Sequence, residues 1–134
     1  MRESFDGLML GHPVTVLGAA FKPGSDDVRD SPALSVAEAL RADGARVMVY
    51  DPVAVENARR VFPELHYAST LEGALEGAEA LVVATDWREF REMDPIASRR
   101  RVARPLVFDG RNCLPTDDWA AAGWDVRRIP QRPS

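Results

Sequence analysis

Short, mainly apolar runs recur along the chain, and each is followed by a glycine, a proline or a polar residue. They consist of β-branched and aliphatic residues without strict alternation, which is typical of strands buried on both faces of a parallel sheet. A weaker run near the end of the chain predicts an edge strand. The predicted strands cover residues 14–17, 47–50, 80–84, 106–109 and 126–129.

Helical patterns separate these runs. Ser31 and Pro32 form an N-cap and a first-turn proline. Apolar residues then follow at helical spacing, at positions 33, 36, 37 and 40, before Gly44 ends the helix. Three shorter helices are predicted. The first covers residues 55–62 and stops before a proline. The second follows a capping box at Ser69 and Glu72, and the third lies around residues 119–122.

Alternating strands and helices predict right-handed crossovers and a parallel sheet. The expected fold class is therefore α/β, a three-layer Rossmann-like open parallel sheet with helices on both faces. One domain is expected to span residues 1–134, with its core at about 13–130. Such sheets bind ligands beyond the carboxyl ends of their strands, so the residues that follow each strand are the ones to examine.

Composition narrows the function classes. The 134 residues carry a formal net charge of −4, which gives no general affinity for nucleic acid or anionic membranes. Cys113 is the single cysteine, so neither an internal disulfide nor a multi-cysteine metal cluster is expected. No signal-like segment or membrane-length apolar run occurs in the sequence, and a cytoplasmic location is expected.

The segment 18–31 after the first strand carries candidate anion-binding chemistry. A dinucleotide fingerprint needs several glycines, but only Gly18 occupies that place, so ordinary NAD binding by this domain alone is not expected. Lys22 and Arg29 supply cations suited to phosphate oxygens. The alternative is that both cations neutralise the acidic residues of the same loop.

Two further strand ends carry polar side chains. Asp51 stands where Rossmann domains place an acid on a ribose hydroxyl, but an Asp-Pro turn is the favoured interpretation. Arg111 follows the strand 106–109 through Asp109 and Gly110, which is expected to turn the chain tightly. It is a candidate second contact to the anion held by Lys22, or else a surface arginine.

Other reactive-looking residues favour structural roles. Cys113 has no motif relation to either histidine, so a small buried residue is favoured over a nucleophile. The run 99–101 is basic and lies near a predicted helix end, where a solvated face is more common than a nucleic-acid contact. Three scattered tryptophans, Trp87, Trp119 and Trp124, are expected in the core or an interface.

Several segments together resemble one known family. GAAFKPGSDDVRDSPA at 18–33, VYDP at 49–52, ATDWREF at 84–90, FDGRN at 108–112 and AGW at 122–124 are similar, in this order, to the C-terminal UDP-binding domain of the UDP-glucose/GDP-mannose dehydrogenase family. The resemblance runs from about residue 14 to residue 129. It looks nearest to the UDP-glucose 6-dehydrogenase type, and enzymes acting on UDP-N-acetylmannosamine or GDP-mannose are similar too.

The resemblance implies a role for named residues. Phe21, Lys22 and Arg111 would contact the UDP-sugar, and Arg29 would reach NAD bound mainly by another domain. In the family, an N-terminal NAD-binding domain and a central dimerisation segment with a catalytic cysteine complete the enzyme, which is commonly a homodimer. The family reaction, UDP-glucose to UDP-glucuronate, needs that cysteine and the nicotinamide.

This chain departs from the family pattern in two places. The glycine-rich dinucleotide loop and the Gly-Gly-x-Cys segment are absent from it, and Cys113 belongs to another motif. The resemblance therefore implies a nucleotide-binding chain with no catalytic residue and no metal site, inactive by itself. A stand-alone Rossmann-like binding or regulatory module is the alternative, and a fragment, a truncated product and a separate subunit all remain open.

Overall fold

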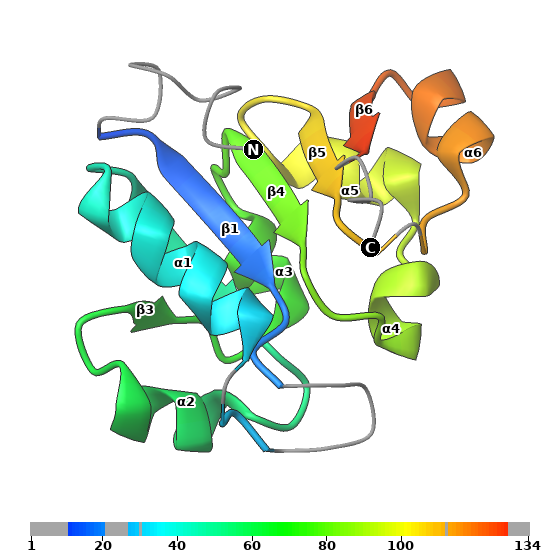
Figure 1. The fold of residues 1–134 in the computed structure, drawn as a ribbon. Helices are drawn as coiled ribbons and strands as arrows, with labels where there is room; N and C mark the ends of the chain where they lie inside the picture. The colour runs from blue at the N-terminus through cyan, green and yellow to red at the C-terminus, as the bar shows by residue number, and fades with distance from the viewer. Residues whose placement is uncertain (1–10, 21–26, 30, 112, 129–134) are drawn as a thin grey trace.

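The computed structural model describes residues 11–20, 27–29, 31–111 and 113–128. Within these residues six strands form one sheet in the order β3-β2-β1-β4-β5-β6, and every neighbouring pair is parallel (Figure 1). The open, fully parallel sheet confirms the predicted fold class. The strands are β1 (Pro13–Leu17), β2 (Arg46–Tyr50), β3 (His66–Tyr67), β4 (Ala80–Val83), β5 (Leu106–Asp109) and β6 (Asp125–Arg128).

The order of the strands locates a crevice. β1 pairs with β2 on one side and with β4 on the other, so the connections leave β1 in opposite directions. Val14 lies opposite Val47 and Ala80 in the two registers. The carboxyl ends of β1 and β4 therefore form the topological switch point of the sheet, the place where such folds bind ligands.

Helix α1 (Pro32–Ala42) begins and ends as its sequence predicts. The Ser31 side chain accepts a hydrogen bond from the Leu34 amide, Pro32 stands in the first turn, and Gly44 has a φ of 99° just beyond the end. The buried residues of the helix are Ala33, Leu34, Ala37 and Leu40, at the spacing of one helical face.

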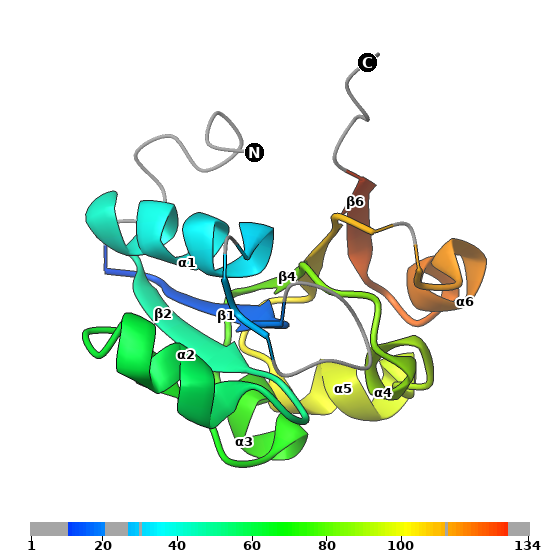
Figure 2. The ribbon, with the colours of Figure 1, turned by 60° about the horizontal axis from the view of Figure 1, so that its bottom comes forward.

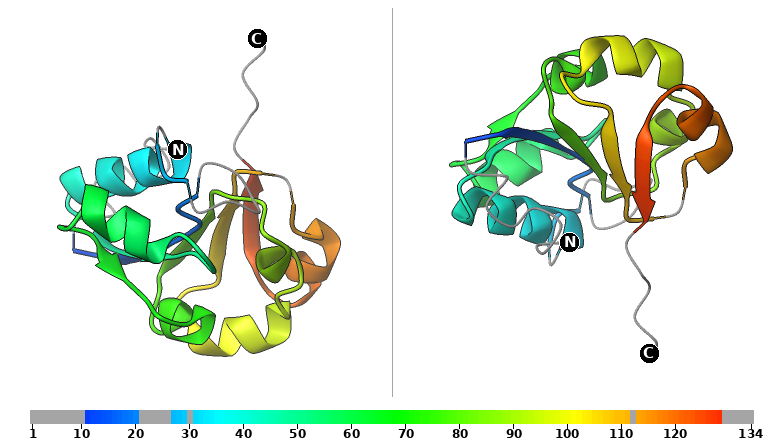
Figure 3. Two further views of the ribbon diagram at one scale, coloured as in Figure 1. Left: turned by 90° about the horizontal axis from the view of Figure 1, so that it is seen from below. Right: turned by 90° about the horizontal axis from the view of Figure 1, so that it is seen from above.

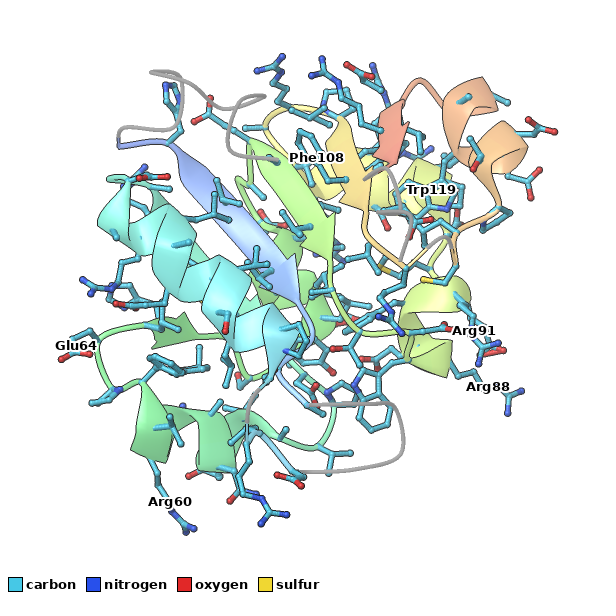
Figure 4. The ribbon with its side chains drawn as sticks, in the orientation of Figure 1. Arg60, Glu64, Arg88, Arg91, Phe108 and Trp119 are labelled. Carbon is cyan, nitrogen blue, oxygen red and sulfur yellow. The ribbon has the colours of Figure 1, made fainter. Side chains whose placement is uncertain are left out.

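The sheet has a hydrophobic core on each face. Alternate residues of β1 point to opposite sides, so Val14 and Val16 lie in the core that includes Leu34 of α1, whereas Leu17 lies in the core on the other side. Figure 2 shows α1 on one side of the sheet and α3 and α5 on the other, and Figure 3 shows α6 beside β6. Phe108 belongs to the first core and Trp119 to the second (Figure 4). The remaining helices are α2 (Val55–Val61), α3 (Leu71–Leu75), α4 (Arg88–Arg91), α5 (Pro95–Arg101) and α6 (Thr116–Ala121).

Some predicted elements need correction. Thr70 and not Ser69 is the N-cap of α3, because its side chain accepts a hydrogen bond from the Gly73 amide. β3, α4 and the start of α5 carry no apolar run and were not predicted. In the part of the chain that the structure describes, no helix is long and apolar enough to cross a membrane.

Candidate functional site

The segment Gly18–Ala20 leaves β1 at the switch point and is held by hydrogen bonds from three other parts of the chain. Its amide groups donate to the Tyr50 carbonyl and to the Asp51 carboxylate. Its Ala19 carbonyl accepts from the Ser31 hydroxyl at 2.8 Å, and its Ala20 carbonyl accepts from the Thr85 hydroxyl at 3.2 Å. The backbone that leads into Phe21 and Lys22 is therefore fixed on both sides.

Asp51 is the centre of this arrangement. Its side chain is buried, and its Oδ2 accepts hydrogen bonds from the Ala19 amide, the Ala20 amide and the Trp87 indole at 2.8, 3.0 and 2.9 Å. Its Oδ1 accepts from the amides of Val53 and Ala54, both at 2.8 Å. The second pair forms the turn predicted for an Asp-Pro step, which confirms that interpretation. Because both oxygens have protein donors, the carboxylate is not presented to a ribose.

A close approach between two strand ends explains the glycine at position 18. Gly18 has a φ of 121°, a conformation that side-chain-bearing residues rarely adopt. A Cβ added there would lie 2.6 Å from the Thr85 Cβ and 2.8 Å from the Thr85 backbone nitrogen. This glycine therefore brings the end of β1 against the residues after β4 and does not open space for a diphosphate.

The turn after β5 is built on a second buried carboxylate. Asp109 is fully buried, and its Oδ1 accepts from the amides of Arg111 and Cys113 while its Oδ2 accepts from the Leu114 amide at 2.9 Å. The chain turns at Gly110 and Arg111, as predicted, although Gly110 is not among the described glycines with a positive φ. The Asp109 side chain holds this turn.

Arg111 lies at the edge of a small apolar crevice. Its side chain is exposed, and the crevice, of about 130 Å³, is lined by residues of α1, of the end of β4 and of the turn after β5. The amino end of α1 contributes Pro32 and Ala33 to the same wall. A cation at the rim of an apolar hollow, beside the amino end of an 11-residue helix, suits an anionic ligand with an apolar or aromatic part.

Arg29 lies beside a different hollow. Its guanidinium forms a paired contact with the Asp27 carboxylate, at 3.0 and 2.9 Å. The Arg29 side chain is 87% exposed, so this ion pair is screened by solvent and weak. Both residues line an open hollow of about 450 Å³ together with Arg60 and Asn57 of α2. The alternative prediction was that Lys22 and Arg29 neutralise acidic residues of their own loop. Arg29 does so in part, since it contacts Asp27.

Two of the predicted ligand contacts, Phe21 and Lys22, lie outside the described residues. The other two, Arg29 and Arg111, lie at separate hollows. The joint contact of Lys22 and Arg111 with one anion stays a prediction. Of the two buried carboxylates that support these loops, Asp51 was predicted to start a turn, whereas no supporting role was predicted for Asp109. The sequence signal that they share is an aspartate at the end of an apolar run.

A larger hollow, of about 660 Å³, lies at the opposite edge of the sheet. It is lined by the starts of β1 and β2 and by α3, with Arg41, Arg46, Glu64 and Glu76 around it. Side chains of both charges line it, and the Arg41 side chain pairs with Glu38. Because none of the described residues that directly follow β1, β2, β4 or β5 lines this hollow, we assign the candidate ligand site to the switch point.

The other residues singled out in the sequence have structural positions. Trp119 and Trp124 are buried, and their rings pack in a tilted arrangement with 4.8 Å between centroids and 59° between planes, as expected of core residues. Residues 99–101 form the exposed end of α5, which agrees with a solvated basic face. Among the described residues, no group of three or more His, Cys, Asp or Glu side chains is arranged to hold a metal ion.

Cys113 is expected to be unreactive in the folded chain. Burial, together with the nearby carboxylates of Asp109 and Asp86, raises the pKa of its thiol to about 12. Because the thiolate is the reactive form, alkylation by iodoacetamide at about pH 8 should be at least ~30-fold slower in the folded chain than in urea. The rate of iodoacetamide with glutathione, measured in buffer and in urea, corrects for the effect of urea on the reagent. Equal rates for folded and unfolded protein would contradict a raised thiol pKa in the folded chain.

Comparison with known proteins agrees with the geometry. The family described as "UDP-glucose/GDP-mannose dehydrogenase family, UDP binding domain" matches residues 15–116. UDP-glucose 6-dehydrogenase YwqF of Bacillus subtilis is 39% identical over 94% of this chain and 29% of its own length. UDP-glucose 6-dehydrogenase AglM of Haloferax volcanii is 49% identical over 85% of this chain and 26% of its own length.

Solved structures place the same fold at one part of larger enzymes. A UDP-D-ManNAc dehydrogenase from Pyrococcus horikoshii superposes with a TM-score of 0.75 at 30% identity, covering 96% of this chain and 28% of that one. This chain therefore spans between a quarter and a third of the length of these relatives. The match covers the loops at the switch point, including Asp51 and Arg111. The chain belongs to the UDP-glucose/GDP-mannose dehydrogenase family, as its UDP-binding domain.

Proposed function

We propose that residues 1–134 act as one domain that binds the UDP part of a nucleotide sugar at the carboxyl edge of the sheet. Arg111 and Lys22 neutralise the diphosphate, and Phe21 contacts the sugar nucleotide beside them. The observation that carries this proposal is the position of Arg111, exposed at the rim of the apolar crevice between α1 and the end of β4. Family membership supports UDP as the ligand.

The complete enzyme is proposed to be an NAD-dependent UDP-glucose 6-dehydrogenase. The turn after β1 does not fit a dinucleotide, because the Ala19 and Ala20 amides already donate to Asp51. NAD would therefore be held mainly by another domain, and Arg29 would approach it from the exposed loop. Cys113 is half-buried with a raised pKa, so this chain alone is expected to bind nucleotide without oxidising it.

Calorimetric titration of the chain with UDP, UDP-glucose, GDP and NAD in parallel tests the proposal. Binding of UDP and UDP-glucose, with weaker or undetectable binding of GDP and NAD, is the expected result. Preference for GDP would move the assignment to the GDP-mannose type. Binding of NAD alone, or of none of the four ligands, would contradict UDP binding by this chain.

Arg111→Ala should weaken UDP binding by about 10- to 100-fold, because one charge-assisted contact to a phosphate contributes ~1.5 to 3 kcal/mol. Arg111→Lys keeps the charge and loses the planar fork, so it should recover part of the affinity. Arg100→Ala removes an exposed arginine from α5, on the other face, and serves as the matched control. Equal UDP affinity in the Arg111→Ala and Arg100→Ala variants would remove Arg111 from the site.

The sugar is the finer part of the proposal. The curated relatives named above are UDP-glucose 6-dehydrogenases, and a solved relative at 30% identity is a UDP-D-ManNAc dehydrogenase. UDP-glucose is proposed because both of those curated relatives share more identity with the chain. Competition between UDP-glucose and UDP-N-acetylmannosamine for the chain gives the comparison directly, and tighter binding of the acetylated sugar would reverse the choice.

A further inference from the structure

The Asp51 carboxylate takes the place of a ligand at the turn after β1. In dinucleotide-binding domains, the amides of this turn face a diphosphate at the first strand end. Here the Ala19 and Ala20 amides face Asp51 Oδ2 at 2.8 and 3.0 Å, and the Trp87 indole donates to the same oxygen. Three N–H groups from two post-strand segments thus converge on one buried anionic oxygen that belongs to the protein.

The other oxygen ties the same carboxylate to the sheet. Asp51 follows β2 directly, and its Oδ1 accepts from the amides of Val53 and Ala54. One side chain therefore joins three segments: the turn after β1, the turn after β2 and the residues after β4. The chain continues from Ala20 into Phe21 and Lys22, which the proposed function places on the UDP-sugar.

We propose that Asp51 is an internal anion that fills the ligand-anion position of this turn, and that it is a positioning residue for nucleotide binding by the segment that follows Ala20. Two consequences follow. Removal of the carboxylate leaves a hole, lined by N–H donors, that suits a small carboxylate such as formate. Removal also loosens the backbone before Lys22, so UDP affinity falls although Asp51 does not contact the nucleotide. The second consequence rests on the proposed function, and the first does not.

Asp51→Ala and Asp51→Asn give opposite expectations for formate. Alanine opens the hole, so sodium formate should raise the melting temperature of Asp51→Ala more than sodium chloride at the same concentration does. Asparagine fills the hole and turns an NH2 group toward N–H donors, so formate should not stabilise that variant. Asp94→Ala is the matched control, because Asp94 is an exposed carboxylate that accepts from two amides, those of Ile96 and Ala97.

The indole resonance of Trp87 reports on the hole itself. In a nitrogen–proton correlation spectrum it should shift in Asp51→Ala and return toward its wild-type position with formate. The Trp124 indole donates to the Pro95 carbonyl and should stay in place, which makes it an internal reference. A general loss of packing would move both resonances, whereas the proposed anion site moves only that of Trp87.

UDP titration completes the test. Asp51→Ala should bind UDP at least ~10-fold more weakly than the wild type, and formate should recover part of the loss without changing wild-type affinity. Wild-type protein that binds no UDP would defeat the proposed function while the formate and indole measurements still test the internal anion. If Asp51→Ala stays unfolded in both salts, the Trp87 indole resonance of Asp51→Asn tests the proposal instead. The proposal is overturned if that resonance does not shift in Asp51→Asn. It is also overturned if formate stabilises Asp94→Ala as much as Asp51→Ala.

Discussion

Gly18→Ala is expected to lower the free energy of unfolding by at least ~4 kcal/mol, a large part of the stability of a domain this size. Two costs add. The φ of 121° lies outside the left-handed region that alanine tolerates, which costs about 1 to 3 kcal/mol. The new methyl group would also meet the side chain and the backbone nitrogen of Thr85, at 2.6 Å from its Cβ and 2.8 Å from its nitrogen, so a strand end must move.

Gly77→Ala is the matched control for that variant. Gly77 also has a positive φ, of 72°, but a Cβ built there meets nothing within 4 Å. Gly77→Ala should lower the free energy of unfolding by only about 1 kcal/mol, because alanine must adopt the left-handed conformation. Urea unfolding followed by circular dichroism gives both values. A Gly18→Ala variant within about 1 kcal/mol of Gly77→Ala would mean that the contact with Thr85 is easily relieved.

Runs of consecutive, mainly apolar residues made most of the sheet predictable. A parallel strand buried on both faces needs consecutive apolar residues, and β1, β2, β4 and β5 lie where such runs occur. β3 was missed because it has two residues, His66 and Tyr67, and neither belongs to such a run. Its position depends on pairing with β2, where His66 lies opposite Met48, and a single sequence carries no local signal of that register.

Local capping chemistry was predictable in kind but not always in place. Ser31 is followed by a proline, which fixes the start of α1. At α3 two adjacent hydroxyl residues, Ser69 and Thr70, compete for the cap. The extended backbone of Thr70, with φ −135° and ψ 157°, directs its side chain to the Gly73 amide, and that geometry is set by the preceding chain.

The site was predictable as a location and not as a network. Residues after β1, β2, β4 and β5 were expected at one edge, because parallel strands end together. The partners of Asp51 are another matter: Ala19 is 32 residues before it and Trp87 is 36 residues after it. Spacing alone cannot show which distant N–H groups a carboxylate will meet, so these long-range partners of Asp51 appear only in the fold.

A ligand-binding edge of this kind needs loops that hold their shape without the ligand. Asp51 and Asp109 meet that need in the same way. Asp51 directly follows β2 and Asp109 is the last residue of β5, and each is buried and accepts hydrogen bonds from loop amides. The side chains of the cations proposed to bind UDP then need not be buried, because the backbone that carries them is already fixed. Arg111 remains exposed on a turn whose backbone Asp109 has fixed.

Asp109→Ala is therefore expected to cost ~3 to 5 kcal/mol of unfolding free energy. The side chain is fully buried and accepts from the amides of Arg111, Cys113 and Leu114, so its removal leaves buried donors without an acceptor. Asp109→Asn keeps the shape but turns an NH2 group toward at least one of these amides, and should cost about 2 to 3 kcal/mol. Urea unfolding measures all of these losses.

Asp94→Ala separates burial from the hydrogen bonds themselves. Asp94 caps α5 by accepting from the Ile96 and Ala97 amides, but it is exposed, so water replaces it and the loss should be about 1 kcal/mol. Asp109→Asn should remain folded enough for titration and bind UDP more weakly than Asp94→Ala, because the turn that carries Arg111 loosens. If Asp109→Ala costs no more than Asp94→Ala, the turn after β5 does not depend on its carboxylate, and the placement of Arg111 must come from the strand alone.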